Sequence, residues 1–375
     1  MSIPLCRPSI GAAEKTAVSE VLMSGQLVQG PRVQAFERAI SDRLSGRGVG
    51  AVGNGTSALH LALLALGIGP GDGVILGDLS WPSPANLREQ SGATPGLGEV
   101  RPDSGNLNPE RLGEAVTDRT RAVIVVHSFG IPADMEGLRR ALASRPDVSV
   151  IEDAACALGA QTAQGPVGTL ADVACFSFHP RKIITTGEGG AVVAGDGAME
   201  ARLRRLCNHG LDLAHDGEER FREAGFNLRM SDLHAAIGLV QMDRIDALIE
   251  ERGRLHRMYR EALASVPEVE LLEGLERAGS VVQSLIVVLE DGFVRDDVLQ
   301  SLRNRGVEAT LASYANHRLP PFRGRAGAEG ERLQNSARMA DQGLTLPLYP
   351  GMEEGAPERV VKALRESLSE QGQGR

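Results

Sequence analysis

The sequence predicts an α/β fold in which a mostly parallel sheet lies between helices and a smaller α+β domain follows. The first observation is an alternation of short apolar runs with helical patterns from about residue 49 to residue 195. The second is a change to long helical stretches after Asn227, and the third is another set of strand and helix patterns beyond them. We therefore predict a large domain over residues 1–245 and a small C-terminal domain over residues 246–375.

The elements of the large domain follow from its apolar runs. Short runs typical of buried strands are VGAV (49–52), VILGDL (74–79), RAVIVVHSF (121–129), VSVIEDAA (148–155), VACFSF (173–178) and AVVAGD (191–196). Between the first two, SALHLALLAL (57–66) has the apolar spacing of a helix. Strands that alternate with helices indicate βαβ units, so we expect the sheet to be mostly parallel.

The remaining elements are mainly helical. The stretch 231–263 has a helical pattern, and either Ser231 or Asp232 is suited to cap its first turn. SLIVVLE (284–290) is an expected strand, and DDVLQSLRNRG (296–306) is an expected helix that Gly306 ends. APERVVKALRESLSE (356–370) predicts a final amphipathic helix.

Composition excludes several classes of function. A net charge of −9 and a pI near 5.5 do not supply the basic face that nucleic-acid binding requires. The four cysteines, at 6, 156, 175 and 207, are far apart and no HExxH motif occurs, so we expect neither a metal site nor a disulfide framework. Without a long apolar run or a signal-peptide pattern, we expect a cytoplasmic protein with no membrane partner.

One lysine differs from the other cations of the chain. There are 37 arginines and only three lysines, and Lys182 lies in SFHPRKIITTGEGG (177–190), before a glycine-rich turn. Arginine stays charged, whereas a lysine amine can lose its proton when desolvated and attack a carbonyl to form an imine. The pattern indicates a Schiff-base lysine, and the alternative is a solvated surface lysine.

A glycine-rich turn before the helix of residues 57–66 is a candidate phosphate site. In VGAVGNGTSALHLALLAL, Thr56 and Ser57 supply hydroxyl groups where the helix begins, and the free N–H groups of that end attract anions. GxxxxGK[ST] is absent, and the turn GNGTSA (53–58) does not match GxGxxG, so the usual nucleotide fingerprints are not found at this helix start. The alternative is a helix cap after a tight turn.

Two carboxylates, Glu152 and Asp153, close the strand in VSVIEDAACALGA. In open α/β sheets, ligands gather at the carboxyl ends of the strands. Adjacent strand residues point to opposite faces, so one carboxylate can face a crevice while the other pairs elsewhere. A buried carboxylate needs a cationic partner, which an arginine or a protonated ring nitrogen would provide. The alternative is a cap for a helix over AACALGA.

Aromatic residues and histidines give further candidates. Trp81, the only tryptophan, follows the strand pattern VILGDL and could stack on a planar cofactor, although a lone tryptophan is more often part of the core. The histidines His127, His179 and His209 fall near strand ends or loops, where structural hydrogen bonding is the commoner role.

Together these features match the requirements of pyridoxal 5'-phosphate (PLP): an imine, a partner for the pyridine nitrogen, a ring platform and a phosphate cup. The sequence resembles the DegT/DnrJ/StrS sugar aminotransferases, which are PLP enzymes of fold type I. The resemblance covers nearly the whole chain through the blocks SGQLVQGPRVQAFE, GNGTSALHLALLALGIGPGD, IEDAACALGA, SFHPRKIITTGEGG, GFNLRMSDLHAAIGL and LTLPLYPG.

The resemblance implies a role for each matching residue. Lys182 would form the imine with PLP and shuttle the proton, and Asp153 would keep the pyridine nitrogen protonated. The phosphate would be held by Gly55, Thr56, Ser57, Ser177 and, from the partner subunit, Asn227. Trp81 would stack on the ring, and His209 would border the substrate pocket. These roles imply a homodimer with shared active sites.

Three departures from the family pattern concern the same region. Asn54 stands where the family often has serine, and Leu228 stands where it commonly has tyrosine. Cys156 replaces the usual glutamine three residues after Asp153, near the phenolic oxygen of the cofactor. That last change puts the hydrogen bonding around the ring in doubt but leaves the imine lysine in place.

The retained Lys182 favours transamination, because relatives that dehydrate have histidine there. The implied reaction moves an amino group from L-glutamate to the keto group of a nucleotide-linked sugar, as in amino-sugar and natural-product biosynthesis. The alternatives are a keto-cyclitol acceptor and a PLP-binding sensor or regulatory protein without activity. Acceptor contacts are expected from the loops 212–225 and 312–325.

Overall fold

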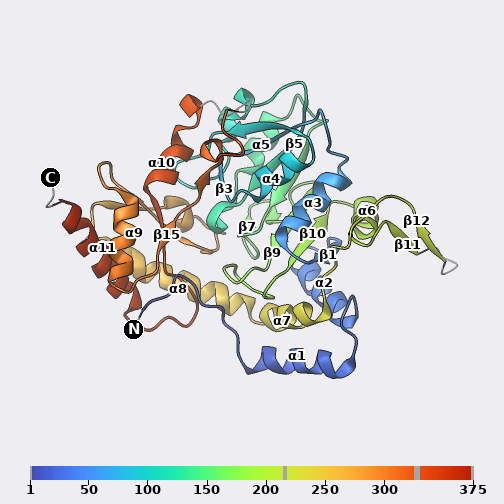
Figure 1. Ribbon diagram of the computed structural model, residues 1–375, viewed down its shortest axis with the longest axis horizontal. Coiled ribbons are helices and arrows are strands. Elements are labelled where there is room, and N and C mark those ends of the chain that lie inside the picture. The colour runs from blue at the N-terminus through green and yellow to red at the C-terminus, as the bar shows by residue number, and fades with distance from the viewer. Residues whose placement is uncertain (1, 214–217, 325–329, 373–375) are drawn as a thin grey trace.

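The computed structural model describes residues 2–213, 218–324 and 330–372. A seven-stranded sheet in the order β1-β10-β9-β6-β5-β2-β4 lies between helices in the larger part of the chain (Figure 1). Strands β9, β6, β5, β2 and β4 pair in parallel, whereas β10 is antiparallel to both of its neighbours. The prediction of a mostly parallel sheet between helices is therefore confirmed.

The strands of this sheet are β1 (Val49–Val52), β2 (Gly73–Gly77), β4 (Thr94–Gly98), β5 (Thr120–Val126), β6 (Ser149–Asp153), β9 (Val173–Ser177) and β10 (Gly190–Ala194). The helices around it are α1 (Ala12–Ser24), α2 (Pro31–Arg43), α3 (Gly55–Ala65), α4 (Ser83–Gln90), α5 (Met135–Ala141), α6 (Gly197–Cys207) and α7 (Asp232–Met242). Two short antiparallel pairs lie outside it, β7 (Gln161–Thr162) with β8 (Gly165–Pro166) and β11 (Leu211–Leu213) with β12 (Glu219–Phe221).

Alternation along the strands divides the core between the two faces of the sheet. On β9, Val173 and Cys175 belong to the cluster that packs with α3 and α6, whereas Ala174 and Phe176 belong to the cluster that packs with α2 and α7. This is the period of two that a strand imposes. Both faces of the strands are thus apolar, which explains why the sequence shows continuous apolar runs instead of a polar alternation.

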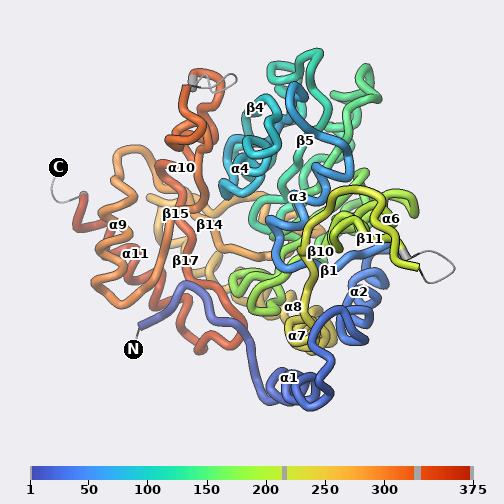
Figure 2. Tube along the Cα trace, turned by 45° about the vertical axis from the view of Figure 1, so that its right-hand side comes forward, coloured from blue at the N-terminus to red at the C-terminus, as the bar shows by residue number. Residues whose placement is uncertain are grey.

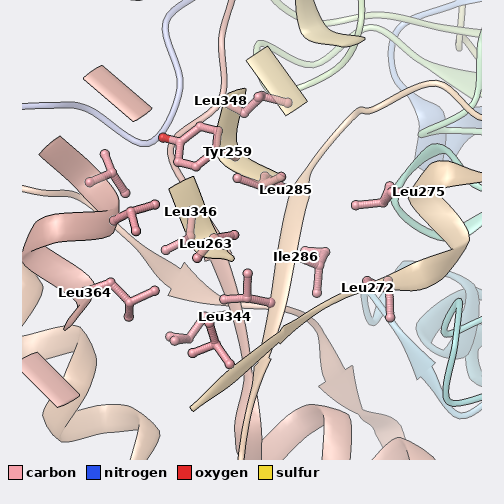
Figure 3. Packing of buried hydrophobic residues seen from close by; sticks show 14 of the residues in the cluster. Tyr259, Leu263, Leu272, Leu275, Leu285, Ile286, Leu344, Leu346, Leu348 and Leu364 are labelled. Atoms are coloured by element: carbon pink, nitrogen blue, oxygen red, sulfur yellow. The ribbon is translucent and has the colours of Figure 1, made fainter. Parts of the chain in front are cut away.

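The smaller part has a four-stranded antiparallel sheet in the order β13-β14-β17-β15. Its strands are β13 (Val269–Leu271), β14 (Leu285–Leu289), β15 (Thr310–Leu311) and β17 (Gly343–Leu346), and its helices are α8 (Ile245–Leu263), α9 (Arg295–Asn304), α10 (Gln334–Gln342) and α11 (Ala356–Gly372). Leucines from the sheet and from α8 and α11 pack closely around Tyr259 (Figure 3). The hydroxyl of Tyr259 donates a hydrogen bond to the carbonyl oxygen of Pro347 at 2.8 Å, so this buried polar group is satisfied.

Several contacts join the parts of the molecule, and two of them are backbone pairings. The backbone of Ile3 pairs with Val307, so the N-terminal segment lies beside the C-terminal strands (Figure 2). The second pairing joins β16 (Tyr314–Ala315), near the C-terminal end of the chain, to β3 (Leu79–Ser80), which follows β2. The division at residues 245 and 246 remains a prediction, although the first residue of α8 lies at that boundary.

Most expected elements are present with small shifts in their ends. Ser231 caps α7 by accepting a hydrogen bond from the backbone N–H of His234, and Gly306 follows α9 with a φ of 75°. The alternative of a capped helix over AACALGA is excluded, because the residues after Asp153 form turns. Among the described residues, no helix is both long and apolar enough to cross a membrane.

Candidate active site

A cavity of about 330 Å3 lies where the two parts of the chain meet. Its walls come from the carboxyl ends of β6 and β9, the start of α3, the segment before α4, and two segments of the smaller part. Of the predicted site residues it is lined by Gly55, Thr56, Trp81, Asp153, Ser177 and Lys182. Ligands are expected at this edge of an open α/β sheet, and six of the predicted site residues meet there.

Lys182 lies in a turn that begins directly after β9. Its backbone N–H donates to the carbonyl oxygen of His179 at 2.8 Å, and Thr186 closes the loop by donating its N–H to the oxygen of Phe178. The side-chain Nζ lies 3.1 Å from Sγ of Cys156. The loop therefore places Lys182, which is half-buried, on the wall of the cavity, and its role as the imine lysine stays a prediction.

Asp153 ends β6 with its side chain toward the cavity and is only 6% exposed. Burial raises the pKa of this carboxyl, although the backbone N–H of Ala155, 3.1 Å from Oδ1, and the charge of Lys182 act to lower it. The other oxygen, Oδ2, forms no hydrogen bond with any described residue. A buried carboxylate with a free oxygen fits a protonated ring nitrogen.

Glu152 points to the opposite face of β6 and has a structural role. Its carboxylate accepts hydrogen bonds from the backbone N–H groups of Gly168 and Leu170, at 2.9 and 2.7 Å, and lies 3.1 Å from Nε2 of His127. Because Nδ1 of His127 accepts from the N–H of Ala133, Nε2 carries the proton. Burial alone would raise the pKa of Glu152, but these donors outweigh it and the pKa is lowered.

The start of α3 is the helix end that the glycine-rich turn predicted, and it has a side-chain cap; its role in holding a phosphate stays a prediction. Asn54 caps the helix by accepting the N–H of Ser57 at 2.8 Å, whereas the N–H groups of Gly55 and Thr56 have no acceptor among the described residues. A Cβ atom on Gly55 would lie 2.8 Å from Cβ of Ser177, so only glycine lets the helix start approach β9 so closely. The substitution of asparagine for serine at 54 thus leaves two donors available for an anion.

Trp81 is on the wall of the cavity and is 66% exposed, which excludes the alternative that it belongs to the core. Its ring contacts the ring of Tyr314 edge to face, with centroids 5.6 Å apart. Stacking of Trp81 on a planar cofactor stays a prediction.

Three predicted residues lie outside this cavity. Ser57 does not line the cavity, and its backbone N–H already donates to Oδ1 of Asn54. Asn227 and His209 are exposed on neighbouring segments, where the N–H of His209 donates to the oxygen of Phe226. Their assigned roles stay predictions. Of the two expected acceptor loops, residues 214–217 and 325 lie outside the described residues.

Sequence reasoning did not name several lining residues. Gln283 and Ser284, directly before β14, were missed, whereas Ala312 and Ser313 lie in the expected acceptor loop 312–325, in which no residue was given a role. Arg181, next to Lys182, also lines the cavity, and its guanidinium forms no ion pair or hydrogen bond with the described residues. No local pattern marks such positions, because only the meeting of the two parts of the chain brings them together.

Comparison with known proteins agrees with this geometry. The model of the DegT/DnrJ/EryC1/StrS aminotransferase family matches residues 8–365. The chain belongs to this family. Among solved structures, an aminotransferase TlmJ from Streptoalloteichus hindustanus is 31% identical over 99% of this chain and 100% of its own, with a TM-score of 0.91.

Two further family structures are similar over nearly the whole chain. DesI, solved in the presence of its TDP-sugar product, is 31% identical over 100% of this chain and 95% of its own, with a TM-score of 0.90. The sugar aminotransferase CalS13 from Micromonospora echinospora is 29% identical over 97% of this chain and 99% of its own, with a TM-score of 0.87. This family of aminotransferases is PLP-dependent, so the chain is an aminotransferase that uses PLP.

The residues around the cavity fit this cofactor. The amine of Lys182 and the free oxygen of Asp153 are present in one cavity, and two unsatisfied N–H groups lie at the start of α3. Lys182 would bind the cofactor covalently, Asp153 would hold its ring nitrogen, and Gly55, Thr56 and Ser177 would hold its phosphate. Among the described residues, no group of three or more potential metal ligands is found.

Proposed function

We propose that this chain transfers an amino group from L-glutamate to a keto group of a nucleotide-linked sugar. The observation that carries the proposal is the pairing, in one cavity, of the Lys182 amine with the buried carboxylate of Asp153. The choice of acceptor is supported by DesI, whose structure was solved with its TDP-sugar product and which is 31% identical to this chain.

Asp153 and Lys182 would have different roles in such a reaction. When bound, PLP supplies an electron sink that makes the proton on the substrate carbon labile. Asp153 would keep the ring nitrogen protonated, and the low polarity around this buried carboxylate would strengthen that interaction. Lys182, once its amine is free, would take that proton and return it to the carbon on the other side of the substrate nitrogen, as a 1,3 proton shift requires. The same lysine thus binds the cofactor and moves the proton.

The charges around the cavity suit anionic substrates. Arg181 and Lys182 both line it, and Arg181 forms no ion pair with the described residues, although Glu188 lines the cavity as well. A guanidinium binds a carboxylate or phosphate with two parallel hydrogen bonds. We therefore assign Arg181 to an anionic group of the amino donor or of the acceptor.

The assembly belongs to the same proposal. Asn227 is exposed and lies away from the cavity of its own chain, which suits a contact with the phosphate in a partner subunit. Exposed apolar side chains at Leu22, Met23, Leu27 and Val28 gather at the end of α1 and just after it. Such a cluster is typical of an interface, so the proposed active unit is a homodimer acting in the cytoplasm.

A keto-cyclitol acceptor is the second candidate, because the serine hydroxyls around the cavity would suit either polyol. Purified enzyme loaded with PLP is mixed with L-glutamate and then with a panel of keto-sugar nucleotides and keto-cyclitols. We expect amine transfer to at least one keto-sugar nucleotide. Transfer only to cyclitols would replace the acceptor, and no reaction with any pair would support a PLP-binding sensor.

Lys182→Ala tests the catalytic assignment. The variant is expected to fold but to lose both turnover and the cofactor that borohydride fixes to the peptide containing residue 182, since no other amine lies in the cavity. Lys362→Ala, on the exposed side of α11, is the matched control and should keep both properties. Normal turnover by Lys182→Ala would overturn the assignment.

A further inference from the structure

A buried cluster outside the cavity links the two parts of the molecule. Asp78, between β2 and β3, is completely buried and its Oδ2 lies 2.6 Å from both Nδ1 of His317 and Oγ of Ser336. Its Oδ1 accepts the backbone N–H of His317 at 2.8 Å. An ionised carboxylate only accepts hydrogen bonds, so all three contacts run toward Asp78. The partners are more than 230 residues away along the chain.

The serine of this cluster is not a nucleophile poised for catalysis. Ser336 donates to Asp78 and has no contact with His317 as a base, and the side chain is fully buried. None of the three residues lines the cavity. The cluster is therefore a structural junction, and what it holds in place determines its function.

The junction holds residues 312–318, which we name the strap. At its first end, Ala312 and Ser313 line the cavity, and at its other end His317 is bound to Asp78. Between them, β16 pairs with β3, with Tyr314 opposite Ser80. Asn316 adds hydrogen bonds from its Nδ2 to the carbonyl oxygen of Asp78, at 2.8 Å, and to Oγ of Ser80, at 3.0 Å.

The same short segment that receives the strap also carries Trp81. Only two residues lie between Asp78 and Trp81, and Tyr314 of the strap contacts the indole. Asp78 thus fixes two walls of the cavity relative to each other: the aromatic wall at Trp81 and the wall at Ser313. Helix α10 is held as well, because Glu99 accepts the N–H groups of Asn335 and Ser336 at 2.8 and 3.2 Å.

We propose that Asp78, acting through His317 and Ser336, is a positioning residue that sets the width of the cavity between Trp81 and Ser313 and thereby the binding of the keto acceptor. The inference rests on the proposed function. An acceptor larger than glutamate must extend beyond the space next to Lys182, toward these walls. The amino donor is smaller and depends less on their separation, so the two substrates should respond differently.

Two variants loosen the junction to different degrees. In Asp78→Asn, an NH2 group that cannot accept a hydrogen bond faces a donor, either on His317 or on Ser336. Ser336→Ala removes only the hydroxyl donor of Ser336 and keeps the side-chain volume nearly constant. Ser367→Ala is the matched control: Ser367 is equally buried, but it donates to Ala363 within α11, far from the cavity. If Asp78→Asn does not fold, Ser336→Ala decides the question against this control.

The first measurement is kinetic and uses the PLP-loaded enzyme. Ser336→Ala is expected to raise the KM for the keto acceptor about threefold or more, and Asp78→Asn about tenfold, as the loss of hydrogen bonds to a charged group implies. The rate of the glutamate half-reaction, followed by cofactor absorbance, should stay within about twofold of wild type. Equal losses in both half-reactions would indicate general destabilisation and overturn the proposal.

The second measurement is independent of activity, because Trp81 is the only tryptophan. Acrylamide quenching of its fluorescence should increase in Asp78→Asn and Ser336→Ala, since a freed strap exposes the indole, and remain unchanged in Ser367→Ala. Unchanged quenching in both junction variants would overturn the proposal. If wild-type enzyme aminates no keto sugar, the proposed function fails, whereas the quenching result still shows whether Asp78 positions this wall.

Discussion

At the scale of single residues, Cys156 is the main departure of this site from its family. Its Sγ lies 3.1 Å from Nζ of Lys182, so a longer glutamine side chain at this position would have to displace the lysine amine or turn away from it. A glutamine amide could add a hydrogen bond of about 1 kcal/mol, whereas a longer side chain in a packed site costs about 1–3 kcal/mol. The packing effect is the larger of the two.

We therefore expect Cys156→Gln to lose PLP faster than wild type, roughly fivefold or more, although it matches the commoner family residue. Release of PLP into glutamate-free buffer, followed by absorbance, measures this. Cys156→Ser keeps the size of the side chain and should release PLP at nearly the wild-type rate. Slower release from the glutamine variant would show that hydrogen bonding outweighs packing here.

We expect the side chain of Asp153 to lower the stability of the apoprotein at neutral pH and to strengthen the binding of PLP. Burial raises its pKa, so the folded apoprotein binds a proton more tightly than the unfolded chain, and stability falls as pH rises above the unfolded value of 3.8. Asp153→Asn should consequently raise the melting temperature of the apoprotein at pH 7, by an amount that shrinks as the pH falls toward 4. It should weaken PLP binding about tenfold or more, because a charge-assisted hydrogen bond is lost.

Melting curves of both apoproteins at pH 7 and pH 4.5, with PLP titrations at pH 7, test these two expectations together. A less stable apoprotein at pH 7 would mean that the charge of Asp153 is already compensated by Lys182. Unchanged PLP affinity would remove Asp153 from the ring nitrogen.

At the scale of elements, the start of α3 depends on one glycine. A Cβ at Gly55 would lie 2.8 Å from Cβ of Ser177, so Gly55→Ala must move the helix away from β9 and widen the phosphate cup. We expect its dissociation constant for PLP to rise about tenfold, as overpacking of 1–3 kcal/mol implies. Gly69→Ala, where an added Cβ meets no atom within 4 Å, is the control. Equal affinities for PLP would show that the cup tolerates this shift.

The elements also show what sequence patterns can predict. The strand β6 and its two carboxylates followed from an apolar run and a period of two, and the structure places Asp153 and Glu152 on opposite faces. The strand β4, TPGLG, was missed because proline and glycine disfavour strands; its place at the edge of the sheet permits them. Asp78 was missed because its partners are distant in sequence and each looks ordinary alone.

At the scale of the whole molecule, the cavity exists only where the two parts meet. Asp153, at the end of β6, and Lys182, in the turn after β9, come from the larger part, and Gln283 and Ser313 come from the smaller part. The residues expected to bind PLP could be predicted from local motifs, because the larger part alone positions them. The residues that face the acceptor could not be predicted, because their position depends on how the strap, which is distant in sequence, is bound to Asp78.

The last prediction concerns assembly. If Asn227 completes the phosphate cup of a partner subunit, a heterodimer of Lys182→Ala with Asn227→Ala has one intact site, formed by Lys182 of one chain and Asn227 of the other. Each parent homodimer has two defective sites. Co-expression with two affinity tags and sequential purification would isolate this heterodimer, and its activity should be about half that of wild type. A heterodimer of Lys182→Ala with Lys362→Ala is the control and should show the same half. Activity near that of the parents would place Asn227 in the site of its own chain, which its position away from the cavity argues against.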